Sequence, residues 1–324
     1  MEKKKILVTD RLSPEALLML QGQDFVQVEK TKSHDISAEE IAGAHALLIR
    51  SRTKVDERLL LQAKNLQVIV TATTGFDHID FDACEKWGVT AMNCPWANVP
   101  TTAQLTWALV LACVHKVNAG HAMIRGGLWD RHLLQSMELA GKTYGIVGLG
   151  RIGSKVAQLA EAFGMHVVAY DPYCEDKNFT EVDAERVSFE ECLKRADVLS
   201  FHVPLTKSTH HMLNRSHFEY IHRGAIVVNT SRGSVINEPD LAEAIEKGWV
   251  LAAGLDVFEK EPLPRTSLLL KMPQIVMTPH VGANSREAFE KASEQAALKI
   301  LAFFRNGSTS DVLPPKRYPE NPWT

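Results

Sequence analysis

The feature that most constrains the fold is a glycine pattern near the middle of the chain. Gly148, Gly150 and Gly153 stand between the β-branched run Thr143–Val147 and a helical stretch at residues 154–163. In a dinucleotide-binding turn, the first glycine permits a tight turn and the second lets the backbone approach a pyrophosphate. The third lets the helix pack closely on the strand. The alternative is a glycine turn without a ligand, but the strand and helix around it favour nucleotide binding.

An acidic residue follows at the expected distance. The next β-branched run, His166–Tyr170, ends at Asp171, eighteen residues after Gly153. A carboxylate there can bind the adenosine ribose hydroxyls and repels a 2′-phosphate, so we expect NAD as the cofactor instead of NADP. A capping aspartate is the alternative.

Short β-branched runs alternate with helical stretches along most of the chain, which predicts an α/β fold with parallel sheets. In the first hundred residues we expect strands at Lys5–Val8, Phe25–Val28, Ala46–Ile49, Val68–Thr71 and Thr90–Asn93, and helices at Pro14–Gln21, Glu57–Ala63 and Asp82–Trp87. A second series predicts strands at Thr143–Val147, His166–Tyr170, Val198–His202, Ala225–Asn229, Ala252–Val257 and Ile275–Thr278.

The 324 residues suggest two domains, and two long helical stretches, Ala103–Val117 and Ser285–Phe304, flank the second series. We therefore predict two doubly wound domains. An NAD-binding Rossmann domain (103–288) would be inserted into a flavodoxin-like substrate-binding domain formed by 1–102 and 289–324. The stretch from Asn306 contains four prolines and is predicted to be an irregular tail.

Composition excludes several classes of protein. The formal net charge is −3, which argues against a nucleic-acid partner. The longest apolar run, Trp107–Val114, is too short to span a membrane, and the apolar stretch near the N-terminus is too short for a signal peptide. We expect a cytoplasmic protein without a membrane partner. The five cysteines are scattered, so neither disulfides nor a metal site is predicted.

Reactive side chains follow several of the expected strands. Arg232 lies just after the strand at 225–229, Asp256 and Glu261 lie within residues 254–262, and His280 follows the strand at 275–278. Ligands of open α/β sheets bind at the carboxyl ends of the strands, so these residues can converge on one site. Singly, each could be a surface arginine, a solvated acid or a loop histidine.

In their order and spacing, these motifs resemble the D-isomer-specific 2-hydroxyacid dehydrogenase family over nearly the whole chain. The resemblance implies that Arg232 anchors the substrate carboxylate and carbonyl, that His280 is the general acid/base, and that Glu261 hydrogen-bonds His280. The formate-oxidising branch has glutamine at the position of Glu261 and is disfavoured. The implied cofactor contacts are Gly148, Gly150, Arg151, Ile152, Gly153, Asp171, Pro204, Thr209, Thr230, Ser231, Arg232, Asp256, His280 and Gly282.

The first domain should supply further substrate contacts. Arg50 and Arg52 follow the strand at 46–49; if that strand continues, both lie on one face and suit a phosphate ester. A solvated basic strand end is the alternative. The segment 49–53 is similar to the substrate-binding segment of the 3-phosphoglycerate dehydrogenases, a branch of this family. The resemblance thus favours oxidation of D-3-phosphoglycerate to 3-phosphohydroxypyruvate, the entry to serine biosynthesis, with substrate contacts from Arg50, Arg52, Thr74, Gly75, Arg232 and His280.

Two departures leave the substrate open. The family usually has glycine at the position of Thr73, beside the loop of Thr74 and Gly75 expected to hold the substrate carboxylate, and glutamate at the position of Gln104. Hydroxypyruvate or glyoxylate reduction is therefore an alternative. Because the chain ends soon after the second long helix, we expect no regulation by serine through a C-terminal domain.

Two further expectations concern partners. An alternative of another class is an NAD(H)-sensing, corepressor-like binding protein, because corepressors share this fold. The segment from Gly126 to Trp129 resembles the dimerisation arm of the family, which predicts a homodimer.

Overall fold

The chain folds into two compact units. The computed structural model describes residues 3–31 and 36–314. One unit comprises the described parts of Met1–Asn98 and Ala283–Pro319, and the other comprises Val99–Gly282. The predicted boundaries at 102/103 and 288/289 are therefore displaced, since both fall inside helices: α5 (Val99–Val114) and α12 (Arg286–Asn306).

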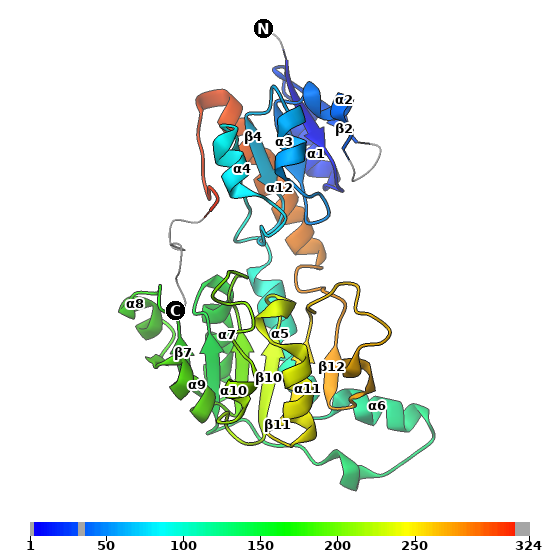
Figure 1. Cartoon of the computed structure of the whole chain (residues 1–324), viewed down its shortest axis with the longest axis vertical. Coiled ribbons are helices and arrows are strands. Elements are labelled where there is room, and N and C mark those ends of the chain that lie inside the picture. The colour runs from blue at the N-terminus through cyan, green and yellow to red at the C-terminus, as the bar shows by residue number, and fades with distance from the viewer. Residues whose placement is uncertain (1–2, 32–35, 315–324) are drawn as a thin grey trace. The chain divides into compact units, whose positions relative to one another are not determined.

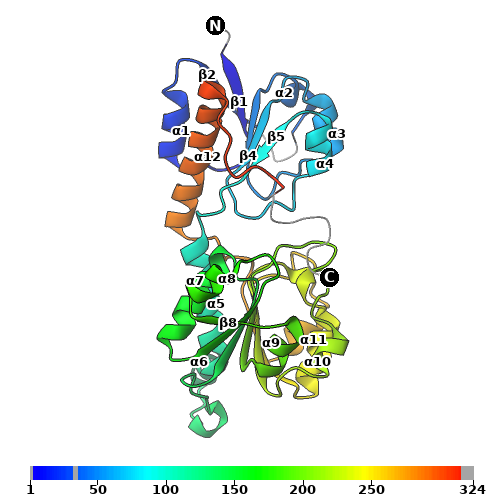
Figure 2. The same ribbon diagram turned by 90° about the vertical axis from the view of Figure 1, so that its left-hand side faces the viewer.

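The first unit is a five-stranded parallel sheet in the order β2-β1-β3-β4-β5. The strands are β1 (Lys4–Val8), β2 (Val26–Lys30), β3 (Ala46–Ile49), β4 (Val68–Thr71) and β5 (Thr90–Met92), and the helices besides α12 are α1 (Pro14–Gln21), α2 (Ala38–Ala42), α3 (Glu57–Gln62) and α4 (Phe81–Lys86). Helices α1 and α12 cover one face of the sheet, and α2, α3 and α4 cover the other (Figure 2).

Alternation along each strand determines which core a side chain enters. In β1, Ile6 and Val8 pack with the side chains of α1 and α12, whereas Leu7 between them packs with those of α2 and α3. Both faces are buried, as a parallel sheet covered on two sides requires, and the strands are accordingly almost continuously apolar.

The second unit is a seven-stranded parallel sheet in the order β12-β11-β10-β9-β6-β7-β8 (Figure 1). The strands are β6 (Thr143–Val147), β7 (His166–Tyr170), β8 (Ala184–Arg186), β9 (Val198–Phe201), β10 (Ala225–Asn229), β11 (Val250–Leu255) and β12 (Ile275–Met277). The elements besides α5 are α6 (Val117–Arg125), α7 (Arg151–Ala162), α8 (Asp176–Thr180), α9 (Phe189–Arg195), α10 (Arg215–Phe218), α11 (Glu238–Glu246) and the short 3₁₀ helices η1 (Arg131–Leu134), η2 (Gly233–Val235) and η3 (Leu268–Lys271).

The strand order reverses between β6 and β9, and helices cover both faces of this sheet. Helices α5 and α7 pack on one face, and α9 and α11 on the other (Figure 2). Ligands of doubly wound sheets bind at such a reversal, outside the carboxyl ends of the strands. The predicted fold class, two parallel-sheet α/β domains, is confirmed.

The departures from the predicted elements have local causes. Strand β8 was not predicted, because it is a short edge strand whose Glu185 and Arg186 give no apolar signal. The first long helix begins at Val99, four residues earlier than predicted, since Pro100 is tolerated in a first helical turn. It ends at Val114, and Lys116 adopts a left-handed conformation (φ 50°) before α6 begins.

Three findings concern what the described residues lack. None of their helices is long and apolar enough to cross a membrane. They contain no group of three or more His, Cys, Asp or Glu side chains placed to hold a metal ion. All five cysteines are described and free, and four of them are buried.

Candidate active site

The glycine turn forms a cradle at the carboxyl end of β6. Gly148 has a left-handed backbone (φ 96°), and a Cβ there would lie 2.7 Å from the carbonyl oxygen of His202. A Cβ on Gly153 would lie 2.1 Å from the carbonyl oxygen of Gly148. Both positions therefore exclude any side chain. Gly150 caps α7, whose first N–H groups have no acceptor within the helix and attract an anion, so a pyrophosphate fits this turn.

Asp171 lies beside this turn and organises it. Its Oδ2 accepts a hydrogen bond from the backbone N–H of Leu149 (2.8 Å), and its Oδ1 accepts from those of Tyr173 (2.9 Å) and Cys174 (3.2 Å). The buried carboxylate thus joins the strand end of β7 to the glycine turn. Carboxylate oxygens have further acceptor capacity, so the position remains suited to ribose hydroxyls.

A second turn, at residues 204–209, follows β9. The hydroxyl of Thr209 is fully buried, donates to the carbonyl oxygen of Pro204 (2.6 Å) and accepts from the backbone N–H of Thr206 (2.7 Å). Thr209 therefore shapes this turn, and its direct contact with a cofactor stays a prediction.

The contact between His280 and Glu261 that the resemblance implies is formed. Nδ1 of His280 lies 2.7 Å from Oε2 of Glu261, and both side chains are partly exposed. Because Nδ1 faces a carboxylate, it carries a proton, and Nε2 is left to exchange a proton with a ligand. Among the described residues, Nε2 of His280 has no hydrogen-bond partner.

Glu261 is held as a carboxylate. Burial acts to raise its pKa, but the hydrogen bonds from His280 and from the backbone N–H of Phe258 (3.1 Å to Oε1), together with the charge of Arg232, lower the pKa below its usual value of 4.5. Each carboxylate oxygen thus has one donor, which fixes the orientation of Glu261 toward the imidazole.

Asp256 builds the turn that carries His280. This fully buried carboxylate accepts hydrogen bonds from the Thr278 hydroxyl (2.6 Å), from the backbone N–H of Val281 (2.8 Å) and from that of Gly282 (2.8 Å). His280 itself has a left-handed backbone (φ 52°), which these bonds stabilise. The resemblance implies that Asp256 contacts the cofactor; the structure gives its oxygens to this turn, and a cofactor contact stays a prediction.

Arg232 sits on a turn held by a residue that sequence reasoning missed. Buried Asn229 donates to the carbonyl oxygen of Arg232 (2.8 Å) and accepts from the backbone N–H (3.0 Å) and hydroxyl (2.8 Å) of Ser231. Nη1 of Arg232 donates to the Ser231 carbonyl oxygen (2.6 Å), and the side chain is half-buried. An asparagine ending a buried strand was the available signal.

Helix α5 supplies two further buried hydroxyls that the sequence did not identify. Thr106 lies 2.8 Å from the hydroxyl of Thr230, and Thr102 donates to the carbonyl oxygen of Gly282 (2.8 Å). Gln104, on the same helix, is exposed. The threonines therefore connect α5 to the strand ends that carry Arg232 and His280.

In the first unit, the condition for placing Arg50 and Arg52 on one face is not met. Strand β3 ends at Ile49, and the residues after it form a turn in which the Thr53 N–H donates to the Arg50 carbonyl oxygen (3.3 Å). Because the strand does not continue, the alternation of side chains along a strand does not place Arg50 and Arg52 on the same face. Arg52 is exposed, whereas Arg50 is half-buried.

The guanidinium of Arg50 lies 5.2 Å from the ring centre of Phe289. Its Nη1 is buried without a hydrogen-bond partner among the described residues. Burial lowers the pKa of Arg50, while the nearby carboxylate of Asp10 opposes that change. Arginine remains charged at neutral pH, so this cation lacks part of its hydrogen bonding and is suited to an anion.

The loop after β4 presents backbone donors. The N–H groups of Thr74, Gly75 and Phe76 have no acceptor within residues 3–31 and 36–314. The Thr73 hydroxyl donates to the carbonyl oxygen of Gly75 (2.7 Å), and Asn93 donates to that of Thr74 (2.7 Å). Thr73 stands where the resemblance leads us to expect glycine, and its hydroxyl braces the loop while the successive N–H groups stay available to an anion.

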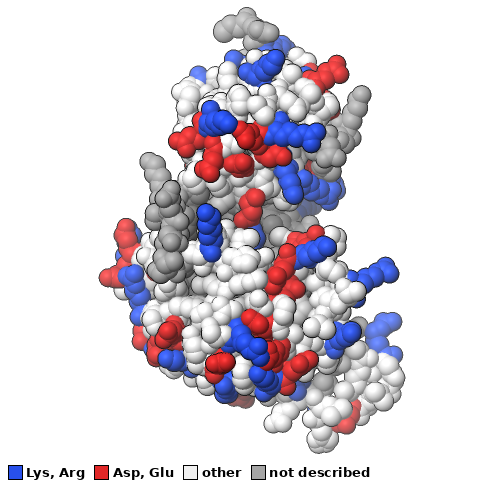
Figure 3. Space-filling view, viewed as in Figure 1, with Lys and Arg blue, Asp and Glu red and all other residues white. Residues whose placement is uncertain are grey.

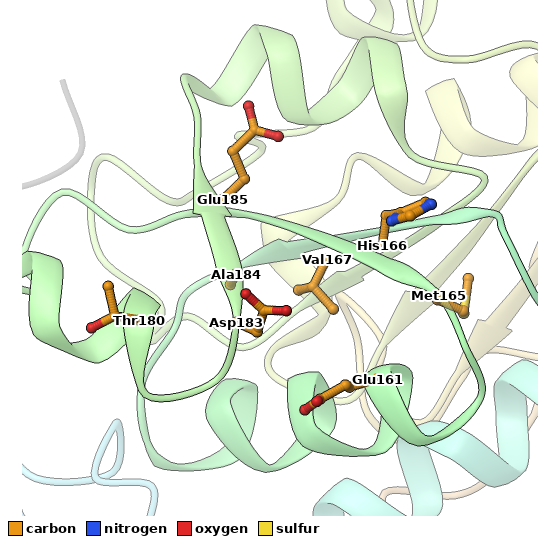
Figure 4. A pocket seen from close by; sticks show the side chains of 8 residues that line it. All are labelled: Glu161, Met165, His166, Val167, Thr180, Asp183, Ala184 and Glu185. Carbon is orange, nitrogen blue, oxygen red and sulfur yellow. The ribbon is translucent and has the colours of Figure 1, made fainter.

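A pocket of about 350 Å³ lies elsewhere in the second unit (Figure 4). It is lined by Glu161, Met165, His166, Val167, Thr180, Asp183, Ala184 and Glu185. His166 begins β7, so this pocket is at the amino-terminal end of that strand, away from the glycine turn. Its acidic side chains are exposed, and it does not contribute to the candidate site.

Comparison with known proteins identifies the family. Residues 107–282 match the D-isomer specific 2-hydroxyacid dehydrogenase, NAD binding domain. The chain is 38% identical over 310 residues to the D-3-phosphoglycerate dehydrogenase of Methanocaldococcus jannaschii, covering 95% of this chain and 59% of that protein. It is also 38% identical to the hydroxypyruvate reductase of Thermotoga maritima, covering 93% of this chain and 98% of the relative. A glyoxylate reductase from Paecilomyes thermophila superposes with a TM-score of 0.90 at 26% identity, covering 97% and 99% of the two chains.

The chain belongs to the D-isomer-specific 2-hydroxyacid dehydrogenase family, as predicted from its motifs. The matched segment is the NAD-binding domain of that family and contains the glycine turn, which confirms the predicted cofactor, NAD. The chain spans little more than half the length of the archaeal D-3-phosphoglycerate dehydrogenase that it matches.

Proposed function

We propose that this protein is an NAD-dependent D-2-hydroxyacid dehydrogenase with His280 as its general acid/base. The observation that carries the proposal is the pair formed by His280 and Glu261, in which Nδ1 is held at 2.7 Å and Nε2 is open. Arg232 sits on a rigid turn of the same unit and supplies a cation for the substrate carboxylate and carbonyl.

In this mechanism, Nε2 of His280 takes the hydroxyl proton of the substrate as the C2–O bond becomes a carbonyl. NAD, which the glycine turn and Asp171 would hold, would supply the hydride acceptor for C2 when bound. Glu261 stabilises the resulting imidazolium through Nδ1–H, and the reverse reaction returns the proton from Nε2 to the carbonyl oxygen. Arg232 keeps the carboxylate and carbonyl oriented throughout.

We propose D-3-phosphoglycerate as the substrate, oxidised to 3-phosphohydroxypyruvate in serine biosynthesis. Its supports are the similarity to proteins named D-3-phosphoglycerate dehydrogenase and the buried guanidinium nitrogen of Arg50, which lacks a hydrogen-bond partner among the described residues. In the same proposal, Arg50 and Arg52 bind the phosphate, and the N–H groups of Thr74 and Gly75 bind the carboxylate.

A substrate panel tests this assignment. We expect purified protein with NADH to reduce 3-phosphohydroxypyruvate with a higher kcat/KM than hydroxypyruvate or glyoxylate. Arg50→Ala and Arg52→Ala should lower kcat/KM for the phosphorylated acid by about 10- to 100-fold, the loss of one charge-assisted contact, and affect the other acids less. A preference for unphosphorylated acids that Arg52→Ala does not change would contradict the proposed substrate.

Reduction of hydroxypyruvate or glyoxylate is the second candidate. It is supported by the similarity to proteins that carry those names and by the exposure of Arg52 within the turn that follows β3. The same panel decides between the two. A corepressor-like NAD(H) sensor is the third outcome: NADH would bind, no 2-oxo acid would turn over, and His280→Ala would change nothing.

We also propose that the protein forms a homodimer through residues 117–134, here called the arm. Within the arm, no residue of α6 is buried, and large apolar side chains are exposed: Val117, Ile124, Leu128, Trp129 and Leu133. Trp129 is 86% exposed. Much of the arm is uncharged on the face shown in Figure 3. Apolar groups gathered in this way are typical of protein interfaces.

A further inference from the structure

The loop that carries Glu261 is joined to the start of α11 by an exchange of hydrogen bonds. The backbone N–H of Glu238 donates to Oε1 of Glu259 (2.8 Å), and the backbone N–H of Glu259 donates to Oε1 of Glu238 (2.7 Å). Burial raises the pKa of Glu238, and the charge of Glu259 adds to that rise. The two backbone donors offset the repulsion between the carboxylates.

His211, from a third segment of the chain, faces the carboxylate of Glu259. Oδ1 of Asn237 accepts from the Asp240 N–H (3.0 Å), which leaves its amide Nδ2 facing Nδ1 of His211 at 3.3 Å. Because an amide nitrogen only donates, Nδ1 of His211 is the acceptor and Nε2 carries the proton. Nε2 lies 3.3 Å from Oε1 of Glu259, within ion-pair distance but outside hydrogen-bond geometry, and this buried nitrogen has no hydrogen-bond partner among the described residues.

The exchange lies close to Glu261, because Glu259 precedes Glu261 by two residues. Phe258, next to Glu259, donates its backbone N–H to Oε1 of Glu261 (3.1 Å), and Oε2 of Glu261 faces Nδ1 of His280. The backbone of Phe258 also packs directly on Gly233, where a Cβ would lie 1.8 Å from the Phe258 carbonyl carbon. Any shift of residues 258 and 259 therefore moves the N–H that orients Glu261.

We propose that Glu238, Glu259 and His211 form a clamp that positions Glu261 against His280. They are positioning residues, because none of them touches the reacting atoms. The inference rests on the proposed function for its catalytic consequence. The clamp requires a hydrogen-bond acceptor on the side chain of residue 259. We therefore expect Glu259→Gln to keep the clamp and Glu259→Ala to lose it.

Two measurements on this chain test the clamp. First, we expect Glu259→Ala to lower kcat about 10-fold with KM for NADH changed less than about 2-fold, since Glu261 is displaced while the glycine turn is untouched. Glu259→Gln should retain most of kcat. In a Glu261→Gln background, Glu259→Ala should lower kcat by less than about 2-fold more, because its effect passes through Glu261.

The second measurement needs no turnover. We expect ¹³C NMR of the Glu261 carboxylate, assigned by comparison with Glu261→Gln, to show its pKa rising toward the usual value in Glu259→Ala. Glu246→Ala, which removes an exposed carboxylate from the other end of α11, should leave that pKa unchanged. Glu238→Ala provides a second variant that should behave as Glu259→Ala if the latter fails to fold.

Two results would overturn the clamp: a Glu261 pKa that stays low in the folded alanine variants, or an equal loss of kcat with and without Glu261. A rise in the Glu261 pKa without turnover of any 2-oxo acid by the unaltered protein would support the clamp and refute the proposed function.

Discussion

The atoms that remain available on His280 and Asp171 decide what these residues can do. Glu261 occupies Nδ1 of His280 and leaves Nε2 open, so the imidazole has one reactive nitrogen. Asp171 binds three backbone N–H groups and still presents a negative charge beside the glycine turn. Both roles depend on the negative charge of a carboxylate, that of Glu261 and that of Asp171. Replacing each carboxylate by the amide of the same shape tests its role.

Asp171→Asn should weaken the preference for NADH over NADPH by about 10-fold or more, since it removes the repulsion of a 2′-phosphate. The measurement is the ratio of dissociation constants from fluorescence titration. Glu175→Gln, an exposed acid four residues away, is the matched control. An unchanged ratio in Asp171→Asn would show that this carboxylate does not select the cofactor.

The lowered pKa of Glu261 predicts a pH-dependent contribution to stability. A depressed folded-state pKa stabilises the folded protein above the unfolded value of 4.5, and this contribution is lost as the pH falls through the lower folded value. We therefore expect the Tm of Glu261→Gln to lie below that of the unaltered protein at pH 6. The difference should shrink as the pH falls below about 4. A constant difference across this range would contradict the lowered pKa.

At the scale of elements, the strands were predicted more accurately than the turns between them. Strands β3, β4, β6, β7 and β10 have the predicted bounds, because β-branched runs buried on both faces are visible in the local sequence. Edge strand β8 was missed, and β3 does not continue to Arg52, which was the condition for placing Arg50 and Arg52 on one face. The conformation of the turn after β3 depends on residues remote in sequence, because the N–H of Arg50 donates to Oδ2 of Asp10 (3.2 Å) and the hydroxyl of Thr53 lies 2.7 Å from that of Thr9.

Asp256 shows how one side chain holds such a turn. We expect Asp256→Asn to lower the free energy of unfolding by about 1–3 kcal/mol, since an amide nitrogen would face N–H donors that now have an acceptor. Thermal and urea unfolding measure this loss. Asp176→Asn, at an exposed site on α8, should change stability by less than about 0.5 kcal/mol. Equal stability of both variants would contradict the organising role of Asp256.

At the scale of the whole molecule, the nucleotide-binding unit is inserted within the chain of the other unit. The N-terminal segment and α12 therefore complete one sheet-and-helix unit, although more than 180 residues separate them. The position of the glycine pattern, together with the two long helices, allowed this insertion to be predicted from sequence. The boundaries shifted because the units divide ahead of α5 and α12 instead of inside them.

The proposed role of the arm predicts the oligomeric state of the protein and of its variants. If it forms the dimer interface, Trp129→Glu places a charge among the exposed apolar side chains and should convert a dimer into a monomer at micromolar concentration. Light scattering after gel filtration measures the mass. Trp96→Glu, at an exposed tryptophan outside the arm, is the control. A monomeric mass for the unaltered protein would refute the homodimer.

The sequence by itself determined the fold class, the order of the motifs and the cofactor, and it predicts Arg232, Glu261 and His280 as site residues, because strand periodicity, glycine turns and strand-end residues are local signals. Only the tertiary structure decided which atoms are engaged. It showed that Arg50 and Arg52 differ in burial and that the oxygens of Asp256 hold the turn of His280. The physical reason is that a hydrogen-bond partner is chosen by proximity in space, and the partners of Asp256 lie 22 to 26 residues away.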